Sequence, residues 1–216
     1  EVSHCFILKN KPHRISTYKI NGSFNTGEMH TVDLDEKDRM ILSLFESNPD
    51  VSQVDIAEQV GLSQPTVGAR IAKLKQSGVI STIAGMNLMK VGLRMAKVDV
   101  TTKDSIKLIN QFKNCPYFLN GLVVSGKENL CMYFIAEDIS SVEAIIDKHI
   151  RSDHAVMDVD FGIVITSVND LTQPVKLNVE KSDLTPCGHD CRTCEYYTNN
   201  RCLGCAASTA YKGSFW

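Results

Sequence analysis

Residues 187–216 hold five of the chain's eight cysteines, and thiols are side chains suited to binding soft and borderline metal ions. Two Cys-x2-Cys pairs lie among them. Each pair can bring two thiolates to one ion from a tight turn, and two pairs complete a tetrahedral four-sulfur site. The spacing therefore predicts a metal site, with structural zinc as the first choice. Its expected ligands are Cys191, Cys194, Cys202 and Cys205, with Cys187 as a fifth candidate and His189 as a weaker one.

An iron–sulfur cluster is the main alternative to zinc, because clusters are also held by thiolates, and redox-switching thiols are a third reading. A disulfide framework is not expected. The chain shows neither a signal peptide nor a run of about 18 apolar residues, which predicts a cytoplasmic protein without a membrane segment. A tail this small needs metal to fold, and its aromatic residues are expected to cover the site. Those aromatic residues are Tyr196, Tyr197, Phe215 and Trp216.

A second chemical signal is a basic stretch in a chain whose net charge is −2. From Gln64 to Lys97 there is no acidic residue, whereas the flanking segments are acidic. A local positive segment of this kind is typical of a surface that meets phosphate, although a solvated charged face would give the same pattern. The cations of this stretch are Arg70, Lys73, Lys75, Lys90, Arg94 and Lys97.

Three short helices are expected to position the start of that basic stretch. Apolar residues recur at the helical period over residues 35–47, and Asn48-Pro49-Asp50 ends that pattern. Ser52 opens a second helix that ends at Gly61, and Ser63 opens a third with Pro65 in its first turn. Residues 79–93 alternate weakly and predict a short hairpin or wing followed by a linker. The pattern predicts a winged helix-turn-helix over residues 31–92.

The third helix is expected to read double-stranded DNA. Val67, Ile71 and Leu74 form its apolar face, and small or polar residues occupy the opposite face, where they would allow close approach to base edges. Gly68 disfavours a helix interior, which suggests such an approach. A protein-contact or dimerisation module is the alternative interpretation of the same helices. The residues expected to bind DNA are Ser63, Gln64, Pro65, Thr66, Gly68, Ala69, Arg70, Lys73 and Lys75.

Residues 93–170 show strand and helix patterns in the order βαββαβ, which predicts a ferredoxin-like sheet with both helices on one face. The expected fold class is therefore α+β. Strands that are apolar on both faces predict that a second subunit covers the open face. Residues 1–30 are expected to form a flexible extension, 171–186 a linker, and 187–216 a small metal-binding module of zinc type.

The stretch from Leu34 to Ile80, together with the βαββαβ segment, resembles the Lrp/AsnC (feast-or-famine) transcriptional regulators. This resemblance covers about residues 33–170 and implies a DNA-binding domain followed by a domain that forms dimers, often octamers, and binds small effectors such as amino acids. In that family a turn between the second and third strands contributes to effector binding. Here the matching turn consists of Gly126, Lys127, Glu128 and Asn129. The family pattern has a Tyr-Asp pair after the glycine, and its absence here predicts a different effector.

Two further functions are kept as alternatives. The two-domain plan is also similar to that of siroheme decarboxylases, which are enzymes and would need basic residues around a tetrapyrrole. His149 and His154 are the nearby histidines, but the basic stretch favours DNA, so the expectation is that the chain is not an enzyme. The other alternative is a metal-dependent or redox-dependent interaction protein. The end of the chain resembles cysteine-rich tails appended to regulators in anaerobic archaea.

Overall fold

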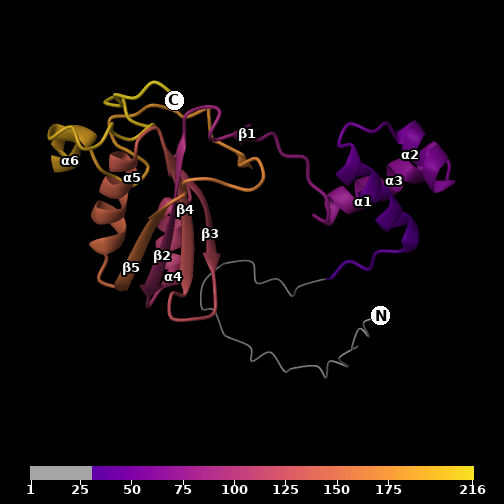
Figure 1. Cartoon of the computed structure of the whole chain (residues 1–216), viewed down its shortest axis with the longest axis horizontal. Coiled ribbons are helices and arrows are strands. Elements are labelled where there is room, and N and C mark those ends of the chain that lie inside the picture. Colours follow the sequence, from indigo (N-terminus) through magenta and orange to yellow (C-terminus); the bar gives the residue numbers. More distant parts are fainter. Residues whose placement is uncertain (1–30) are drawn as a thin grey trace, which may run out of the picture.

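A computed structural model describes residues 31–216. The predicted extension over residues 1–30 lies outside the described residues. Three helices at one end are joined by an extended segment to an α+β body, and the cysteine-rich tail lies on that body (Figure 1). In the described part of the chain, no helix has the length and apolar character needed to cross a membrane.

The three predicted helices are confirmed as α1 (Glu36–Ser47), α2 (Gln53–Val60) and α3 (Gln64–Gln76). Asp35 caps α1 in a reciprocal capping box with Asp38. Serine side chains accept from backbone amides at the starts of α2 and α3. Gly61 ends α2 with φ of +70°, a left-handed conformation that glycine adopts at no steric cost. The side chains buried between the helices are Ile41, Ile56, Ala57, Val60, Val67, Ile71 and Leu74.

The predicted βαββαβ domain is confirmed. Its antiparallel sheet has the strand order β3-β4-β2-β5, and both helices pack on one face, where their buried side chains share one core cluster with those of β2 and β4. Alternate residues of the central strands β2 and β4 meet the helices, so that Val98, Met132 and Phe134 are fully buried. The elements are β2 (Arg94–Thr102), α4 (Ser105–Phe112), β3 (Phe118–Val123), β4 (Leu130–Ala136), α5 (Ile139–Ile146) and β5 (Val156–Ile163).

The face of the sheet opposite the helices is mixed rather than apolar, which corrects the prediction of strands that are apolar on both faces. Asp99 of β2 lies between Cys131 of β4 and Asp160 of β5, and it forms an ion pair with Lys97 at 2.5 Å. Leu122 adds an exposed apolar side chain at the edge. This face offers charge pairs as well as apolar contacts to any partner.

The segment between the two domains also differs from its prediction. Instead of a hairpin or wing next to α3, strand β1 (Met86–Asn87) pairs with β6 (Thr172–Gln173), which lies within the predicted 171–186 linker. Leu88, Leu93 and Ile135 form a small buried cluster beside this pairing. The segment that enters the four-stranded sheet and the segment that leaves it therefore pair with each other at one place on the body.

The tail packs on the helix-covered side of the body and shares its core. Ala206 is fully buried in the same cluster as the sheet residues, and Trp216 packs against that cluster. The Tyr117 hydroxyl donates a hydrogen bond of 2.5 Å to the Gly204 carbonyl. The tail has little regular structure, namely the 3-10 turn η2 (Cys191–Thr193) and the short helix α6 (Glu195–Thr198). The tail therefore gains apolar contacts from the domain, in addition to those among its own residues.

Candidate functional site

Helix α3 presents one buried face and one exposed face, as its sequence predicts. Val67, Ile71 and Leu74 are buried against α1 and α2. The opposite face contains no acidic side chain and begins with a proline in the first turn. Its exposed residues are Gln64, Pro65, Thr66, Ala69, Ala72, Lys73 and Lys75.

The hydroxyl groups at the start of α3 are partly used by the helix itself. Ser63 Oγ lies 2.8 Å from Thr66 Oγ1 and accepts a hydrogen bond from the Thr66 amide. Capping of this kind fixes the first turn and leaves Gln64 as the polar side chain at the tip that is not committed to the cap. The positive end of the helix dipole lies at the same tip and favours a phosphate there.

Arg70 has a different role from the one predicted by its position in the basic stretch. Its guanidinium donates to Asp35 and Asp38, each at 2.7 Å, and so links α3 to the capping box of α1. Hydrogen bonds from the Asp38 amide and from Arg70 lower the pKa of Asp35, and the two carboxylates raise the pKa of Arg70. Two carboxylates balance its charge, and Arg70 holds α3 against α1. Within residues 31–216, Lys73 and Lys75 form no ion pair.

Gly68 also faces the protein rather than the outer surface of α3. A β-carbon built at Gly68 would lie 3.0 Å from Oε1 of Gln53, the first residue of α2. The glycine is half-buried at this crossing. The close approach predicted from sequence therefore occurs between α2 and α3.

The predicted effector turn lies at the end of the sheet. Gly126 has φ of +142°, and Lys127 and Glu128 are exposed. The Asn129 amide donates to the Thr102 carbonyl at 2.7 Å and accepts from the Thr102 amide at 2.9 Å. Asn129 thus fastens the turn to β2, and Lys127 forms an ion pair with Asp158 at 3.2 Å, while Glu128 is exposed.

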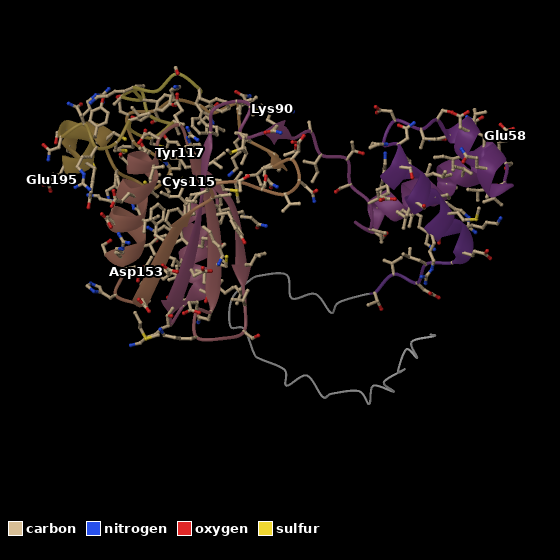
Figure 2. All side chains as sticks on the ribbon, in the orientation of Figure 1. Glu58, Lys90, Cys115, Tyr117, Asp153 and Glu195 are labelled. Atoms are coloured by element: carbon tan, nitrogen blue, oxygen red, sulfur yellow. The ribbon has the colours of Figure 1, made fainter. Side chains whose placement is uncertain are left out.

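The five tail cysteines converge on one cavity of about 80 Å³ between the tail and the body. Cys115, which follows α4, lines the same cavity, and Figure 2 shows it beside Tyr117 near the tail. Sequence reasoning left Cys115 unassigned because it lies more than seventy positions before the tail and in no Cys-x2-Cys pair. Burial raises the pKa of Cys115 to about 11. The cavity is lined mainly by apolar and thiol groups.

Two backbone amides of the tail point at cysteine sulfurs, as expected for thiolate ligands. The Cys205 amide donates to Cys191 Sγ at 3.2 Å, and the Gly204 amide donates to Cys202 Sγ at 3.4 Å. Gly204 has φ of +86°, which allows the tight turn between Cys202 and Cys205. Burial raises the pKa of Cys202 and of Cys205, and a bound cation would favour their thiolate forms.

The spacing of the sulfurs bears on the type of metal. Zinc bonded to sulfur at about 2.3 Å in a tetrahedral site places the sulfurs about 3.8 Å apart. We looked for groups of three or more His, Cys, Asp or Glu residues whose ligand atoms all lie within 4.8 Å of one another. Among residues 31–216 there is one such group, and it consists of His149, Cys187 and His189. The four thiols predicted to bind zinc surround the cavity at wider spacing and would have to approach one another around a single ion.

Comparisons with known proteins agree with this architecture. A family model of winged helix-turn-helix DNA-binding domains matches residues 34–81. A leucine-responsive regulatory protein of Rhizobium meliloti is 26% identical over 153 residues, which cover 66% of this chain and 96% of that protein. The chain is therefore similar to helix-turn-helix transcriptional regulators of the Lrp/AsnC type over both of its domains.

Two other proteins extend this comparison. An uncharacterized HTH-type transcriptional regulator of Pyrococcus horikoshii is 27% identical over 119 residues, covering 53% of this chain and 75% of that protein. The crystal structure of a Neisseria meningitidis transcriptional regulator in complex with L-Met shares the fold, with a TM-score of 0.55 and 21% identity over 68% of this chain and 98% of that one. Because the curated relatives are regulators, the prediction that the chain is not an enzyme is confirmed, and the siroheme decarboxylase alternative is set aside. The relatives come from archaea and bacteria alike, so they give no support to a specifically archaeal type.

Proposed function

We propose that the chain is a regulator of the Lrp/AsnC type that reads specific DNA sequences with the exposed face of α3. The observation that carries the proposal is the acid-free outer face of that helix, with Gln64, Ala69 and Lys73 exposed on it. A polar amide at the tip can hydrogen-bond a base edge, and the alanine lets the helix lie deep in the major groove. Lys73 and Lys75 supply phosphate contacts, which position the helix without specifying sequence.

The experiment is a salt-titrated binding measurement on the full chain. Fluorescence anisotropy with DNA from upstream of the chain's own gene should show saturable binding that weakens steeply with salt and exceeds binding to a scrambled duplex. Lys73→Glu should weaken binding to both duplexes, and Gln64→Ala should reduce the preference for the specific one. Lys103→Glu, an exposed charge reversal on the body at the end of β2, is the matched control. If Lys73→Glu and Gln64→Ala both bind like the control, α3 does not read DNA.

The tail is proposed to add a metal site on Cys191, Cys194, Cys202 and Cys205, with zinc as the first expectation. The two amide-to-sulfur hydrogen bonds and the shared cavity support this assignment. Elemental analysis and absorbance of anaerobically purified protein test it, since an iron–sulfur cluster is coloured and zinc is not. Cys194→Ser should remove the metal, and Cys131→Ser, a sheet cysteine outside the cavity, should not. Folded protein that contains neither zinc nor iron would rule out the site.

Oligomerisation and effector binding are proposed on the family pattern. The sheet face that carries Asp99 and Leu122 and the turn of Lys127 and Glu128 are the surfaces available for a dimer or octamer and for a small effector. The Neisseria relative binds L-Met, so amino acids are the first ligands to test. Light scattering coupled to gel filtration gives the oligomeric state. A thermal-shift screen of amino acids, with Glu128→Ala as the variant, tests the effector site. A monomeric protein whose melting temperature changes with none of the amino acids would contradict both proposals.

A further inference from the structure

A short π-helical turn places a histidine next to the tail. Helix α5 continues into η1 (Asp147–Arg151), in which His149 is half-buried. π-Helical turns are rare and frequently occur at functional sites. The His149 ring packs edge-on against Phe112, with ring centroids 6.2 Å apart. Packing of this kind restricts the imidazole to one orientation, toward the start of the tail.

A tight turn in the tail holds two further ligand side chains opposite that histidine. Thr185 is buried, and its hydroxyl donates to the His189 carbonyl at 2.9 Å and accepts from the His189 amide at 3.2 Å. The Gly188 amide donates to the Thr185 carbonyl at 2.8 Å, and Gly188 has φ of +80°. These bonds close the loop around Gly188, so that Cys187 and His189 project to the same side.

The three ligand atoms already have spacing close to that of a metal site. Cys187 Sγ lies 3.8 Å from His149 Nε2, the two imidazole centroids are 5.1 Å apart, and one ligand atom from each residue lies within 4.8 Å of the other two. A tetrahedral zinc ion with Zn–S of about 2.3 Å and Zn–N of about 2.0 Å would place sulfur and nitrogen about 3.5 Å apart. Small side-chain rotations are therefore enough to bring all three onto one ion.

The surroundings of His189 also match those of a metal ligand. Its Nδ1 lies 3.0 Å from the Cys187 carbonyl oxygen. When Nδ1 donates a hydrogen bond to that carbonyl, Nε2 keeps the lone pair that a metal needs. A backbone carbonyl that fixes the tautomer in this way is a regular partner of metal-binding histidines.

We propose that His149, Cys187 and His189 bind a metal ion at a site separate from the four-thiol site of the tail. Two imidazoles and one thiolate suit a borderline or soft ion, Zn²⁺ or Cu⁺. On binding, the Cys187 thiol releases its proton to solvent and the sulfur donates its electron pair to the ion, with no change of oxidation state. Three protein ligands would leave a fourth position for water or a small ligand, and all three residues line the cavity.

The ion would join two parts of the molecule that are far apart in sequence. His149 belongs to the body, whereas Cys187 and His189 belong to the tail, so the bound ion fastens the tail to η1. The assignment also leaves Cys191, Cys194, Cys202 and Cys205 together as the thiols of the other site. Because metal binding at this site needs neither DNA nor those four thiols, it can be tested independently of the function proposed above.

The test is metal titration of the reduced full chain, prepared metal-free, with Co²⁺ as a spectroscopic substitute for Zn²⁺. Wild-type protein should bind one equivalent more than His149→Gln, His189→Gln or Cys187→Ser, and the difference should show the ligand-field bands of a site with mixed nitrogen and sulfur ligands. His154→Gln, an exposed histidine close to η1, is the matched control and should bind like wild type. Competition between Zn²⁺ and Cu⁺, each buffered by a chelator, identifies the preferred ion.

Replacing His149 with a different metal-binding side chain distinguishes metal coordination by His149 from a packing role. His149→Cys should restore the lost equivalent with stronger sulfur-to-cobalt charge-transfer absorption, a result that a packing role of His149 would not produce. His189 is exposed, so its replacement tests the site without the risk of unfolding the body. If both histidine variants bind the same number of Co²⁺ ions as His154→Gln, the site does not exist. If Cys187→Ser instead loses the all-sulfur spectrum, as Cys194→Ser does, Cys187 belongs to the thiol site and the proposal is wrong.

Discussion

Replacing Tyr117 with phenylalanine should loosen the tail from the body without changing the apolar core. The Tyr117 side chain is buried, and its hydroxyl donates to the Gly204 carbonyl in the turn between Cys202 and Cys205. Tyr117→Phe keeps the ring, which packs edge-on against Trp216 with centroids 5.1 Å apart. The change therefore removes one hydrogen bond and leaves a buried carbonyl oxygen without a donor.

The size of the effect follows from that geometry. A buried acceptor left without its donor costs about 1–2 kcal/mol in the free energy of unfolding. In a chain of this size each kcal/mol lowers the melting temperature by about 2–4 °C, so the expected fall is about 2–8 °C. Trp216 is the chain's single tryptophan, and its indole donates to the Lys176 carbonyl at 2.9 Å. Its fluorescence during urea unfolding therefore reports docking of the tail rather than unfolding of the helix-turn-helix.

Tyr196→Phe provides the matched control, because its hydroxyl reaches Asp147 at 3.3 Å from a half-exposed position. That substitution should change the free energy of unfolding by less than about 0.5 kcal/mol and so leave the urea midpoint close to that of wild type. Equal midpoints for Tyr117→Phe and Tyr196→Phe would refute the argument that Tyr117 holds the tail to the body.

Three further predictions concern the DNA-binding domain and the pH response of the tail. Arg70→Met should lower the thermal stability of the helix-turn-helix, measured by circular dichroism. Lys73→Ala should leave that stability unchanged and reduce the salt slope of DNA binding by about 1. The opposite pattern would show that Arg70 contacts phosphate. Gly68→Ala should retain DNA affinity and stability, because the new methyl group displaces only the flexible end of Gln53 and alanine favours the helix by about 1 kcal/mol. A large loss of affinity would instead show that DNA approaches Gly68. Burial alone would raise the pKa of Glu137, but hydrogen bonds from Tyr211, Ser214 and Phe215 outweigh burial and lower that pKa. The stability that these hydrogen bonds give is therefore present above the pKa of the unfolded chain, about 4.3, and is lost as pH falls toward the pKa of the folded protein. Acid titration of Trp216 fluorescence should show this loss in wild type and a flatter response in Glu137→Gln, and parallel curves would contradict it.

The parts of the fold that sequence predicted well are those encoded by neighbouring residues. Ser63, Pro65 and Gly78 mark the limits of α3 within a residue or two, because caps and breakers act through the adjacent backbone. The sheet order likewise follows from alternating patterns and short connections. Burial of Val67 and Leu74 was predicted for the same reason, since one helical period fixes which side chains share a face.

The features that sequence missed depend on residues distant along the chain. The position of Arg70 in a basic stretch gave no indication that two acids of α1 would bind it. His149 gained significance only when η1 brought it opposite Cys187, thirty-eight positions later. A π-helical turn has no periodic pattern of its own, and Cys115 joins the thiol cavity through packing alone. Local spacing could identify the tail cysteines but not their partners on the body.

The position of the tail gives it a direct physical connection to the DNA-binding domain. Phe215 and Trp216, at the end of the chain, pack against the cluster that contains Leu88 and Leu93. Those leucines follow β1, the first element after the helix-turn-helix, and β1 pairs with β6 on the segment that leads to the tail. A change in how the tail docks would therefore act on the segment that follows the DNA-binding helices. Because packed clusters shift between discrete arrangements rather than deforming continuously, a metal that fastens the tail would act on this contact.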